Sequence, residues 1–447
     1  MKGINLGLKE NWRQFTLLVL INAFVGGMVG MERAILPQIA EMEFHLAAKT
    51  AIFSFIIVFG LVKALTNYFT GALANRFGRK TLLMLGWLFG IPVPFMLMHA
   101  PNWDWIVAAN ILLGINQGLA WSSTVVMKID LVGENERGLA MGLNEFAGYL
   151  AVAVVAFLTS WIAANWGLRP YPFYLGVALS LAGFFGSWLL VHDTRRHVAQ
   201  ETAASDLAVR QNIFWDTTLF DRNLGGVTQA GLINNLNDAM VWGLFPLMLA
   251  QQGFSLEDIG MIVAIYPGVW GIGQLFTGKM SDYFCKKSML FWGMFLQGLA
   301  LVLFVFASSF VHYAALSIAL GWGTAMVYPT FLATIAENTH PQDRAQSLGV
   351  FRMWRDLGYA VGALLTGVVA DALGFNAGII TIGVLTLASA LIVQQRMRCR
   401  TEAVKLTKWL LQKIAGDQVQ TRPRPLKTSL VKNRTIARVN HFLVSFL

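Results

Sequence analysis

The chain has 447 residues, of which 56% are hydrophobic and only 13% are charged. A water-soluble domain usually carries about a quarter of its residues as Asp, Glu, Lys or Arg, so this composition excludes an ordinary soluble enzyme. The net charge of +10 comes from residues 395–447, which hold 12 Lys and Arg but only two acids. The rest of the chain is neutral overall, so the basic excess does not indicate a nucleic-acid-binding body.

Twelve apolar segments are each long enough to cross a membrane as a helix. A hydrocarbon core about 30 Å thick needs roughly 20 helical residues at a rise of about 1.5 Å each. The first segment follows a basic start but has no small-residue cleavage site, so we expect a retained helix rather than a signal peptide. The predicted fold class is all-α integral membrane, with 12 transmembrane helices over residues 15–36, 51–73, 81–99, 105–127, 138–163, 172–191, 224–250, 259–278, 288–307, 313–335, 345–370 and 375–394.

One long connection separates the first six predicted helices from the last six. We therefore predict an N-terminal bundle over residues 1–191, a central loop over 192–223, a C-terminal bundle over 224–394 and a basic tail over 395–447.

The distribution of Lys and Arg predicts the orientation in the membrane, because short basic loops stay on the cytoplasmic side. The N-terminus and the loops after predicted helices 2, 4, 6, 8 and 10 hold sixteen of them. The opposite loops hold only Lys49 and Arg169. We expect both termini to lie on the cytoplasmic face of the plasma (inner) membrane.

The two halves of the chain repeat each other at an offset of 207 residues. Gly71 corresponds to Gly278, and Gly142 corresponds to Gly349. A constant offset across separate loops indicates a duplicated six-helix unit. Parallel repeats of this kind build one large class of alternating-access carriers.

The connection between predicted helices 2 and 3 reads Gly71-Ala-Leu-Ala-Asn75-Arg76-Phe-Gly78-Arg79-Lys80. This segment resembles the cytoplasmic loop signature of the major facilitator superfamily, Gly-x-x-x-Asp-Arg-x-Gly-Arg-Arg/Lys, with an asparagine in place of the acid. The equivalent loop of the second half keeps the acid, as Asp282, but lacks the arginine and the second glycine. Signature, duplication and central loop together cover about 390 residues. The resemblance implies the twelve-helix transporter fold of that superfamily.

The resemblance also implies that this loop latches the two halves together in the outward-open state. Arg137 and Arg344 each follow a loop that contains an acid, Asp130 or Glu337, and are the expected partners in the latch. With Asn75 uncharged, the first latch is expected to be weaker than the family norm. The alternative is that these charges only set the topology. The predicted gating residues are Gly71, Asn75, Arg76, Gly78, Arg79, Asp282, Arg137 and Arg344.

Ionisable residues inside the predicted helices indicate a polar cavity, because a charge that faces lipid is costly. Lys63, Asp238 and Asp356 are predicted to lie near the midplane, where carriers bind their cargo. Asn234 lies four residues before Asp238 and shares its helix face, although this polar stretch could instead clamp two helices together. The candidate substrate and coupling residues are Glu32, Arg33, Lys63, Glu145, Asn234, Asp238, Arg352, Arg355 and Asp356.

The predicted helix over residues 345–370 carries three of these charges. Arg352 and Asp356 are four residues apart, so we expect a salt bridge between them. Arg355 is then left without an acid on its own face. Its expected partner is Glu145, or an anionic substrate held in a bidentate fork. The alternative is an internal charge network that only holds the halves in register.

Three acids are candidates for carrying a proton. Asp238 and Glu145 are the leading ones. Glu32, with Arg33 beside it, resembles the acid on helix 1 of proton antiporters in this family, but an ion-pair gate is an equal alternative.

These features predict a secondary active transporter that moves a small polar or anionic solute by alternating access, most simply as a proton symporter. Drug antiporters of the family typically carry a Gly-x-x-x-Gly-Pro-x-x-Gly-Gly signature in helix 5, and the segment that starts at Gly142 and continues through Gly148 has no proline. A multidrug/proton antiporter that acts in efflux, or a non-transporting sensor or scaffold, is the alternative. The sequence shows no nucleophile–base pair or metal-ligand spacing, so no enzyme, cofactor or metal is predicted.

The two cysteines and the tail complete the expectations. Cys285 and Cys399 are both placed on the cytoplasmic side, where thiols are expected to stay reduced. Residues 402–414 interleave apolar residues with lysines, which predicts an amphipathic helix on the anionic lipid surface, with a protein partner or simple topology anchoring as the alternatives. We expect a monomer whose partners are a small-molecule substrate, a proton as the coupling ion and these lipids, without nucleic acid.

Overall fold

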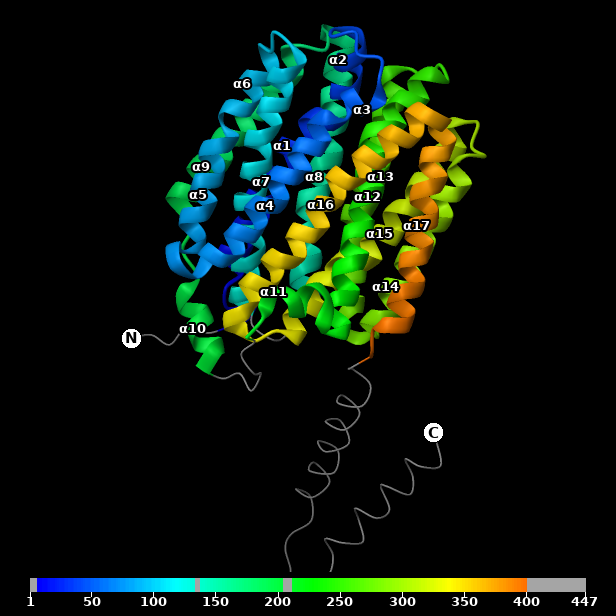
Figure 1. Cartoon of the computed structure of the whole chain (residues 1–447). Coiled ribbons are helices and arrows are strands. Elements are labelled where there is room, and N and C mark those ends of the chain that lie inside the picture. Colours follow the sequence, from blue (N-terminus) through cyan, green and yellow to red (C-terminus); the bar gives the residue numbers. More distant parts are fainter. Residues whose placement is uncertain (1–5, 133–136, 204–210, 400–447) are drawn as a thin grey trace, which may run out of the picture. The chain divides into compact units, whose positions relative to one another are not determined.

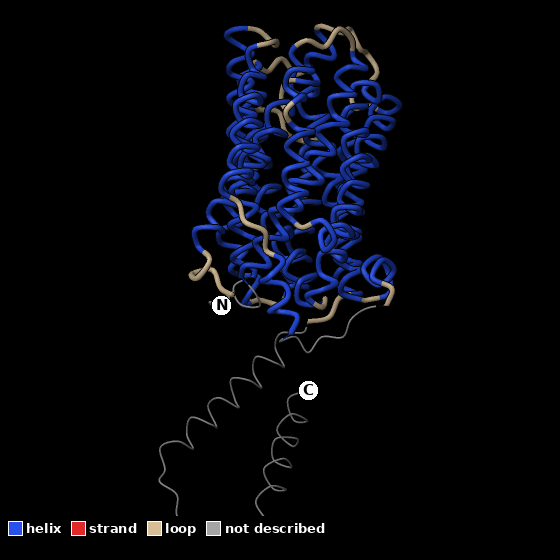
Figure 2. Tube along the Cα trace, turned by 90° about the vertical axis from the view of Figure 1, so that its left-hand side faces the viewer, coloured by secondary structure: helices blue, strands red, loops and turns tan. Residues whose placement is uncertain are grey.

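The computed structural model describes residues 6–132, 137–203 and 211–399, and every regular element in these ranges is a helix (Figures 1 and 2). The predicted tail helix over residues 402–414 lies outside the described residues. The elements are α1 (Trp12–Arg33), α2 (Leu36–Met42), α3 (Lys49–Ile52), α4 (Ser54–Phe77), α5 (Arg79–Gly90), α6 (Pro92–Met98), α7 (Trp103–Val132), α8 (Arg137–Trp166), η1 (Tyr171–Phe173), α9 (Tyr174–Leu190), α10 (Arg195–Ala203), α11 (Ile213–Trp215), η2 (Asp216–Phe220), α12 (Arg222–Gln251), α13 (Leu256–Tyr283), α14 (Lys286–Phe304), α15 (Phe310–Asn338), α16 (Pro341–Leu373) and α17 (Phe375–Arg396).

Each predicted transmembrane segment coincides with a long helix or with two consecutive helices, as in α5 and α6. Among the described residues, ten of these spans are long and apolar enough to cross a membrane. Two long helices, α7 and α12, are not among the ten, and both are rich in buried amides and hydroxyls such as Asn116 and Asn235. These buried polar residues lower the mean hydropathy of the two helices.

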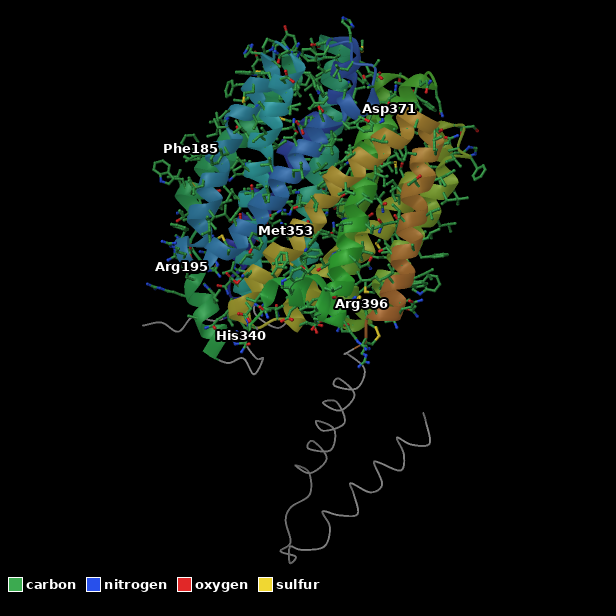
Figure 3. The ribbon with its side chains drawn as sticks, viewed as in Figure 1. Phe185, Arg195, His340, Met353, Asp371 and Arg396 are labelled. Carbon is green, nitrogen blue, oxygen red and sulfur yellow. A yellow bond between two sulfur atoms is a disulfide. The ribbon has the colours of Figure 1, made fainter. Side chains whose placement is uncertain are left out.

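The bundle exposes many large apolar side chains and buries many polar ones alongside its apolar core. Phe185, Phe276 and Trp292 are exposed large hydrophobic residues, and Phe185 points away from the bundle in Figure 3. By contrast, Arg33 and Asp238 are fully buried. A surface this rich in large apolar residues, over an interior that holds charges, fits a protein that lies in lipid.

Two long helix pairs hold the first repeat against the second. In one pair α4 packs on α16, and a Cβ added to Gly71 would lie 2.6 Å from the carbonyl oxygen of Ala345. In the other pair α8 packs on α13, and a Cβ added to Gly142 would lie 2.4 Å from the carbonyl oxygen of Gln274. Only glycine permits such close backbone approach. Because Gly71 and Gly142 correspond to Gly278 and Gly349, the two crossings are equivalent under the repeat.

The two repeats are in contact at both ends of the bundle. The end that carries the Gly71–Lys80 loop, here called the motif end, is the lower end in Figure 1, where α10 and α11 also lie. At the opposite end, Asp371 accepts hydrogen bonds from the backbone N–H of Lys49 at 2.9 Å and from the Thr50 hydroxyl at 2.8 Å (Figure 3). The repeats therefore meet on both sides of the bundle centre.

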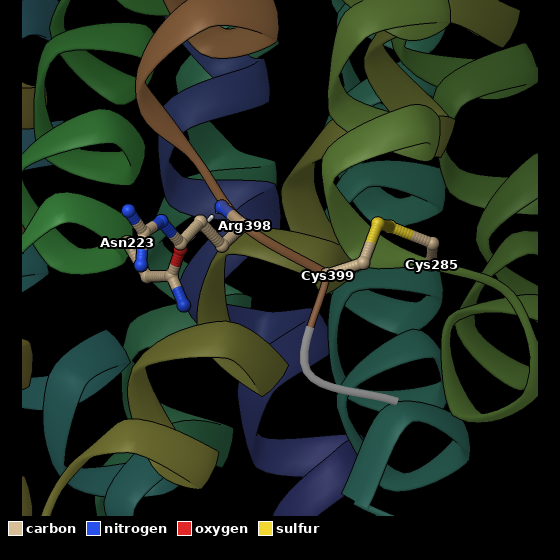
Figure 4. Close-up of a disulfide and its surroundings, with 4 residues drawn as sticks. All are labelled: Asn223, Cys285, Arg398 and Cys399. Carbon is tan, nitrogen blue, oxygen red and sulfur yellow. Dashed lines mark hydrogen bonds between the residues drawn. A yellow bond between two sulfur atoms is a disulfide. The ribbon is translucent and has the colours of Figure 1, made fainter. Parts of the chain in front are cut away.

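The expectation of two reduced cysteines is wrong for this structure, because Cys285 and Cys399 form a disulfide with Cα atoms 5.6 Å apart (Figure 4). Cys285 occupies the position that corresponds to Gly78 in the first repeat. Next to Cys399, the backbone N–H of Arg398 donates a hydrogen bond of 2.9 Å to the Asn223 side chain, which fixes the position of the chain after α17. The two cysteines are 114 positions apart in the sequence, so the sequence alone gave no sign that they are close in space.

Candidate functional site

All eight ionisable residues predicted inside the helices are buried, and six of them meet in the centre of the bundle. Each is at most 6% exposed. They come from five helices of both repeats, so only the folded bundle brings them together. The central six are Lys63 on α4, Glu145 on α8, Asp238 on α12, and Arg352, Arg355 and Asp356 on α16.

Asp356 is the most heavily bonded of the central acids. One of its oxygens, Oδ1, lies 3.4 Å from Lys63 Nζ and accepts hydrogen bonds of 3.1 Å from Arg355 Nη1 and Asn235 Nδ2. The other oxygen accepts a hydrogen bond from the Asn67 amide. Four partners from three helices, two of them cationic, bind this carboxylate and tie α4 to α12 and α16.

The predicted salt bridge between Arg352 and Asp356 is not formed. Arg352 instead donates to the Ser122 hydroxyl at 3.1 Å and the Tyr328 hydroxyl at 3.3 Å, and its Nη2 lies 3.9 Å from Glu145. The prediction failed because helical spacing shows only which residues can meet on one helix. The oxygens of Asp356 are occupied by partners from other helices, which leaves Arg352 to reach toward α8.

Arg355 also differs from its prediction, because its acidic partners are Asp356 and Asp238 rather than Glu145. Its Nη2 lies 3.8 Å from Asp238 Oδ2 and donates to the Tyr149 hydroxyl at 3.1 Å. Asp238 accepts hydrogen bonds from the Tyr266 hydroxyl and, at 3.3 Å, from the Tyr359 hydroxyl. Asp238 is therefore held mainly by phenols, with one long contact to a guanidinium.

Glu145 is held in a similar way. One of its oxygens, Oε1, accepts hydrogen bonds from the Asn144 amide and, at 3.3 Å, from the Trp121 indole. Its other oxygen, Oε2, has no hydrogen-bond partner in the described part of the chain. Glu145 and Asp238 are thus the two central acids with weak cationic contacts, whereas Asp356 has strong ones.

Glu32 and Arg33 form a separate buried pair on α1, with 3.7 Å between Glu32 Oε1 and Arg33 Nη1. Asn110 donates to Glu32 at 3.2 Å. The Arg33 guanidinium lies 4.4 Å from the ring centroid of Phe59 and 5.1 Å from that of Trp242. Arg33 is therefore stabilised mostly by aromatic faces, which compensate for part of its lost hydration.

Aromatic residues that the sequence did not single out as site residues wall the central charges. Tyr149 stacks on Trp270 with ring centroids 3.3 Å apart, and the Arg355 guanidinium lies 4.2 Å from the Tyr328 centroid. Tyrosines at scattered helical positions look like packing residues in a sequence. Only the fold shows that their hydroxyls form hydrogen bonds with the central charged residues. A further residue, Lys128, was missed because it lies one position beyond a predicted helix end; it is fully buried and donates to the Leu18 carbonyl at 2.9 Å.

Asn234 shares the interior face of α12 with Asp238, as predicted, and is fully buried. Neither its amide nitrogen nor its amide oxygen has a hydrogen-bond partner among the described residues. A small cavity of about 10 Å³ lies between the central charges and the motif end, lined by Asn67, Ser122 and Arg352 among others. It has room for about one water molecule.

The motif loops form ion pairs within each repeat. Arg79 Nε lies 3.3 Å from Asp130 Oδ2, and the repeat-equivalent Lys286 Nζ lies 2.6 Å from Glu337 Oε1. A contact between repeats comes from Asp282, which accepts a hydrogen bond of 3.3 Å from the backbone N–H of Leu139 at the start of α8.

The other predicted gating residues lie at the same end. Gly78 has a φ of +88° and packs against Asp193 and Arg195. Arg76 is exposed beside the Phe77 ring, and Arg344 is buried at the start of α16. The side chains of Asn75 and Arg137 lie outside the described part of the structure.

Comparison with known proteins agrees with this architecture. Residues 17–222 and 227–444 match the Major Facilitator Superfamily. The human organic anion transporter MFSD10 (TETRAN) has a similar fold, with a TM-score of 0.68 and 14% identity over 86% of this chain and 99% of that one.

Curated relatives are similar at low identity. The proton-coupled antiporter flippase LtaA of Staphylococcus saprophyticus is 23% identical over 82% of this chain and 89% of its own. The multidrug resistance protein MdtG of Yersinia enterocolitica is 25% identical over 74% of this chain and 79% of its own, and the quinolone resistance protein NorA of Staphylococcus aureus is 21% identical over 71% and 80%. With two repeats, buried charges and a family match over most of its length, the chain is a multi-pass membrane transporter, not an enzyme, and it belongs to the Major Facilitator Superfamily.

Proposed function

We propose that this transporter carries an organic anion together with a proton. The main support for this proposal is a pair of buried arginines one turn apart on α16. Arg352 and Arg355 each reach an acid of another helix only through a long contact, of 3.9 Å to Glu145 and 3.8 Å to Asp238. A carboxylate or phosphate that entered the site would form shorter, charge-assisted hydrogen bonds with these guanidinium groups.

The direction of proton coupling follows from charge balance. An anion that binds Arg355 displaces Asp238 from its cationic partner. A buried carboxylate without a counter-ion is costly in free energy, so Asp238 binds a proton when it loses its contact with Arg355. Because arginine does not release its own proton, the anion and the proton then occupy the protein together and cross in the same direction. In this proposal Asp356 has a structural role.

Alternating access completes the proposal. We propose that residues 1–191 and 224–394 rock as two bundles about the central charges, with both termini on the cytoplasmic face of the inner membrane. The glycine crossings at Gly71 and Gly142 support this motion, since they join the repeats at one end without side chains. The Asp282 hydrogen bond to α8 is one contact that has to break when the motif end opens.

The names of the relatives favour a second candidate, an antiporter of organic cations. LtaA is a proton-coupled antiporter, and MdtG and NorA are resistance proteins. A cation that paired with Asp356 would displace Lys63, which, unlike arginine, can release its proton. Solute and proton would then move in opposite directions.

Flux in proteoliposomes separates the two candidates. Purified protein is given a panel of carboxylates, phosphates and quaternary or aromatic amines, and internal pH is followed during downhill solute movement. We expect anions to move and protons to accompany them. Movement of amines alone, with protons in the opposite direction, would establish the second candidate, and no flux of either class would contradict both.

Arg355→Lys sharpens this experiment, because lysine keeps the charge but loses the fork. We expect at least about a tenfold weaker apparent affinity for anions, the equivalent of roughly 1.4 kcal/mol. The control is Arg13→Lys, which changes an exposed arginine near the start of α1. Equal effects of the two substitutions would remove Arg355 from the binding role.

A further inference from the structure

One side of the central site contains buried hydrogen-bonding groups without partners. Trp270 and Gln274 lie one turn apart on α13 and are both fully buried. The indole N–H of Trp270 and both amide atoms of Gln274 have no hydrogen-bond partner among the described residues. Native interiors rarely leave such groups unpaired, because each unmade bond costs free energy.

The repeat-equivalent position shows that the fold can satisfy such an amide. Asn67 on α4 corresponds to Gln274 at the offset of 207 residues. Its nitrogen donates to Asp356 and its oxygen accepts from the Ser122 hydroxyl. The same backbone crossing thus carries a fully bonded amide in one repeat and an unbonded amide in the other.

The unpaired groups lie beside the proposed anion site. Trp270 stacks on Tyr149, whose hydroxyl accepts a hydrogen bond from Arg355. Glu145, one turn from Tyr149 on α8, has one unpaired carboxylate oxygen. Gln274 is next to the same stretch of α8, because its backbone carbonyl approaches Gly142. Donors, acceptors and ring faces therefore border one region of the α8–α13 crossing.

We propose that Gln274 and Trp270 form a subsite for the hydroxyl groups of the cargo, and that the cargo is an organic anion with a planar, hydroxyl-bearing ring. This inference rests on the proposed function. Each hydroxyl group donates one hydrogen bond and can accept others, so two hydroxyl groups of the cargo can together satisfy the Gln274 amide, the Trp270 N–H and the free oxygen of Glu145. The ring of such a cargo stacks on the aromatic faces. Its carboxylate pairs with the arginines of α16.

The first test compares the stability of two repeat-equivalent variants without added solute. The protein is held in lipid nanodiscs, because sugar detergents carry hydroxyl groups themselves. We expect Gln274→Leu to melt at or above the wild-type temperature, since it removes an unpaired amide. Asn67→Leu should melt lower by about 2 °C or more, since it removes bonded groups. A drop for Gln274→Leu equal to that for Asn67→Leu would overturn the inference.

The second test measures binding of 3,4-dihydroxybenzoate against benzoate, which differ only in two hydroxyl groups. We expect the wild type to bind the dihydroxy compound at least about tenfold more tightly, and Gln274→Leu to reduce this preference to about twofold or less. The control is Thr366→Val, which removes another buried unpaired hydroxyl, located on α16 away from the central charges. It should keep the preference.

The outcomes separate the subsite from the proposed function. Equal binding of both compounds, absence of binding, or a preference that survives in Gln274→Leu would overturn the subsite. If benzoate still enters proteoliposomes with a proton, the proposed function stands without it. If neither benzoate nor any other anion of the flux panel moves, the proposed function fails as well.

Discussion

The two crossings between the repeats share one backbone geometry but carry different chemistry. At the α4–α16 crossing, Lys63 pairs with Asp356. At the α8–α13 crossing, the equivalent positions hold Trp270 and Tyr149, which stack on each other. The duplicated fold has the same helix contact twice, with different residues in each. We call the Lys63–Asp356 pair the ionic clamp and the Trp270–Tyr149 pair the aromatic wall.

The comparison indicates how the work of a carrier is divided. Asp356 of the clamp has bonding partners on both of its oxygens, so in our proposal the clamp stays in place whether or not cargo is present. The aromatic wall leaves polar groups unpaired, so it has bonding capacity for cargo. Glu145 and Arg352 are also repeat equivalents, and they face each other at 3.9 Å across the centre between the crossings.

The largest expected effect comes from breaking the clamp. Asp356→Ala leaves Lys63 and Arg355 buried with less compensation, and we expect a loss of about 3–5 kcal/mol in the free energy of unfolding together with loss of transport. Tyr149→Phe at the equivalent position removes a single hydrogen-bond acceptor, and it should cost about 1 kcal/mol. Denaturation in detergent measures both. Equal losses would contradict the division between clamp and wall.

Exchange of the facing charges tests the pseudo-symmetry of the centre. Glu145→Arg and Arg352→Glu should each reduce uptake strongly, because each places like charges together. The double variant restores opposite charges across the same axis. We expect partial recovery, with a coupling free energy of roughly 1–3 kcal/mol in a double-mutant cycle of stability. If the two losses simply add, the residues do not act as a pair.

The smallest effect is expected for Lys286→Met at the motif end, where two repeat-equivalent ion pairs differ in exposure. Arg79→Met removes a buried partner of Asp130, and should cost about 3 kcal/mol, because both side chains are at most 6% exposed. Lys286→Met, its repeat equivalent, should cost less than about 1 kcal/mol, because the Glu337 side chain is 41% exposed. Thermal unfolding of the two variants checks this order. A larger cost for Lys286→Met would contradict it.

The sequence was sufficient to predict the helices, the duplication and the burial of the central charges, because these depend on length, hydropathy and spacing along one chain. The offset of 207 residues also identified the pairs of equivalent residues, such as Gly71 and Gly278. Those properties need no knowledge of which helices touch.

The partners within the site could not be predicted, because they come from helices far apart in the sequence. Helical spacing suggested Arg352 with Asp356, whereas Asp356 is occupied by Lys63 of the other repeat. Tyr266 and Tyr359 donate hydrogen bonds to Asp238, but an uncharged tyrosine in a predicted helix does not stand out in a sequence as a partner of an acid. The Cys285–Cys399 disulfide escaped prediction for the same reason, since it depends on where the chain runs after α17.

The most direct test of the central claim is the proton-to-solute ratio in proteoliposomes for the wild type and Asp238→Asn. The claim is that Asp238 takes up the coupling proton when an anion occupies Arg355. We predict about one proton with each anion, in the same direction, for the wild type. Asp238→Asn should still exchange the anion downhill but should not accumulate it against its gradient. Proton-driven accumulation by Asp238→Asn, or protons moving opposite to the anion in the wild type, would contradict the account.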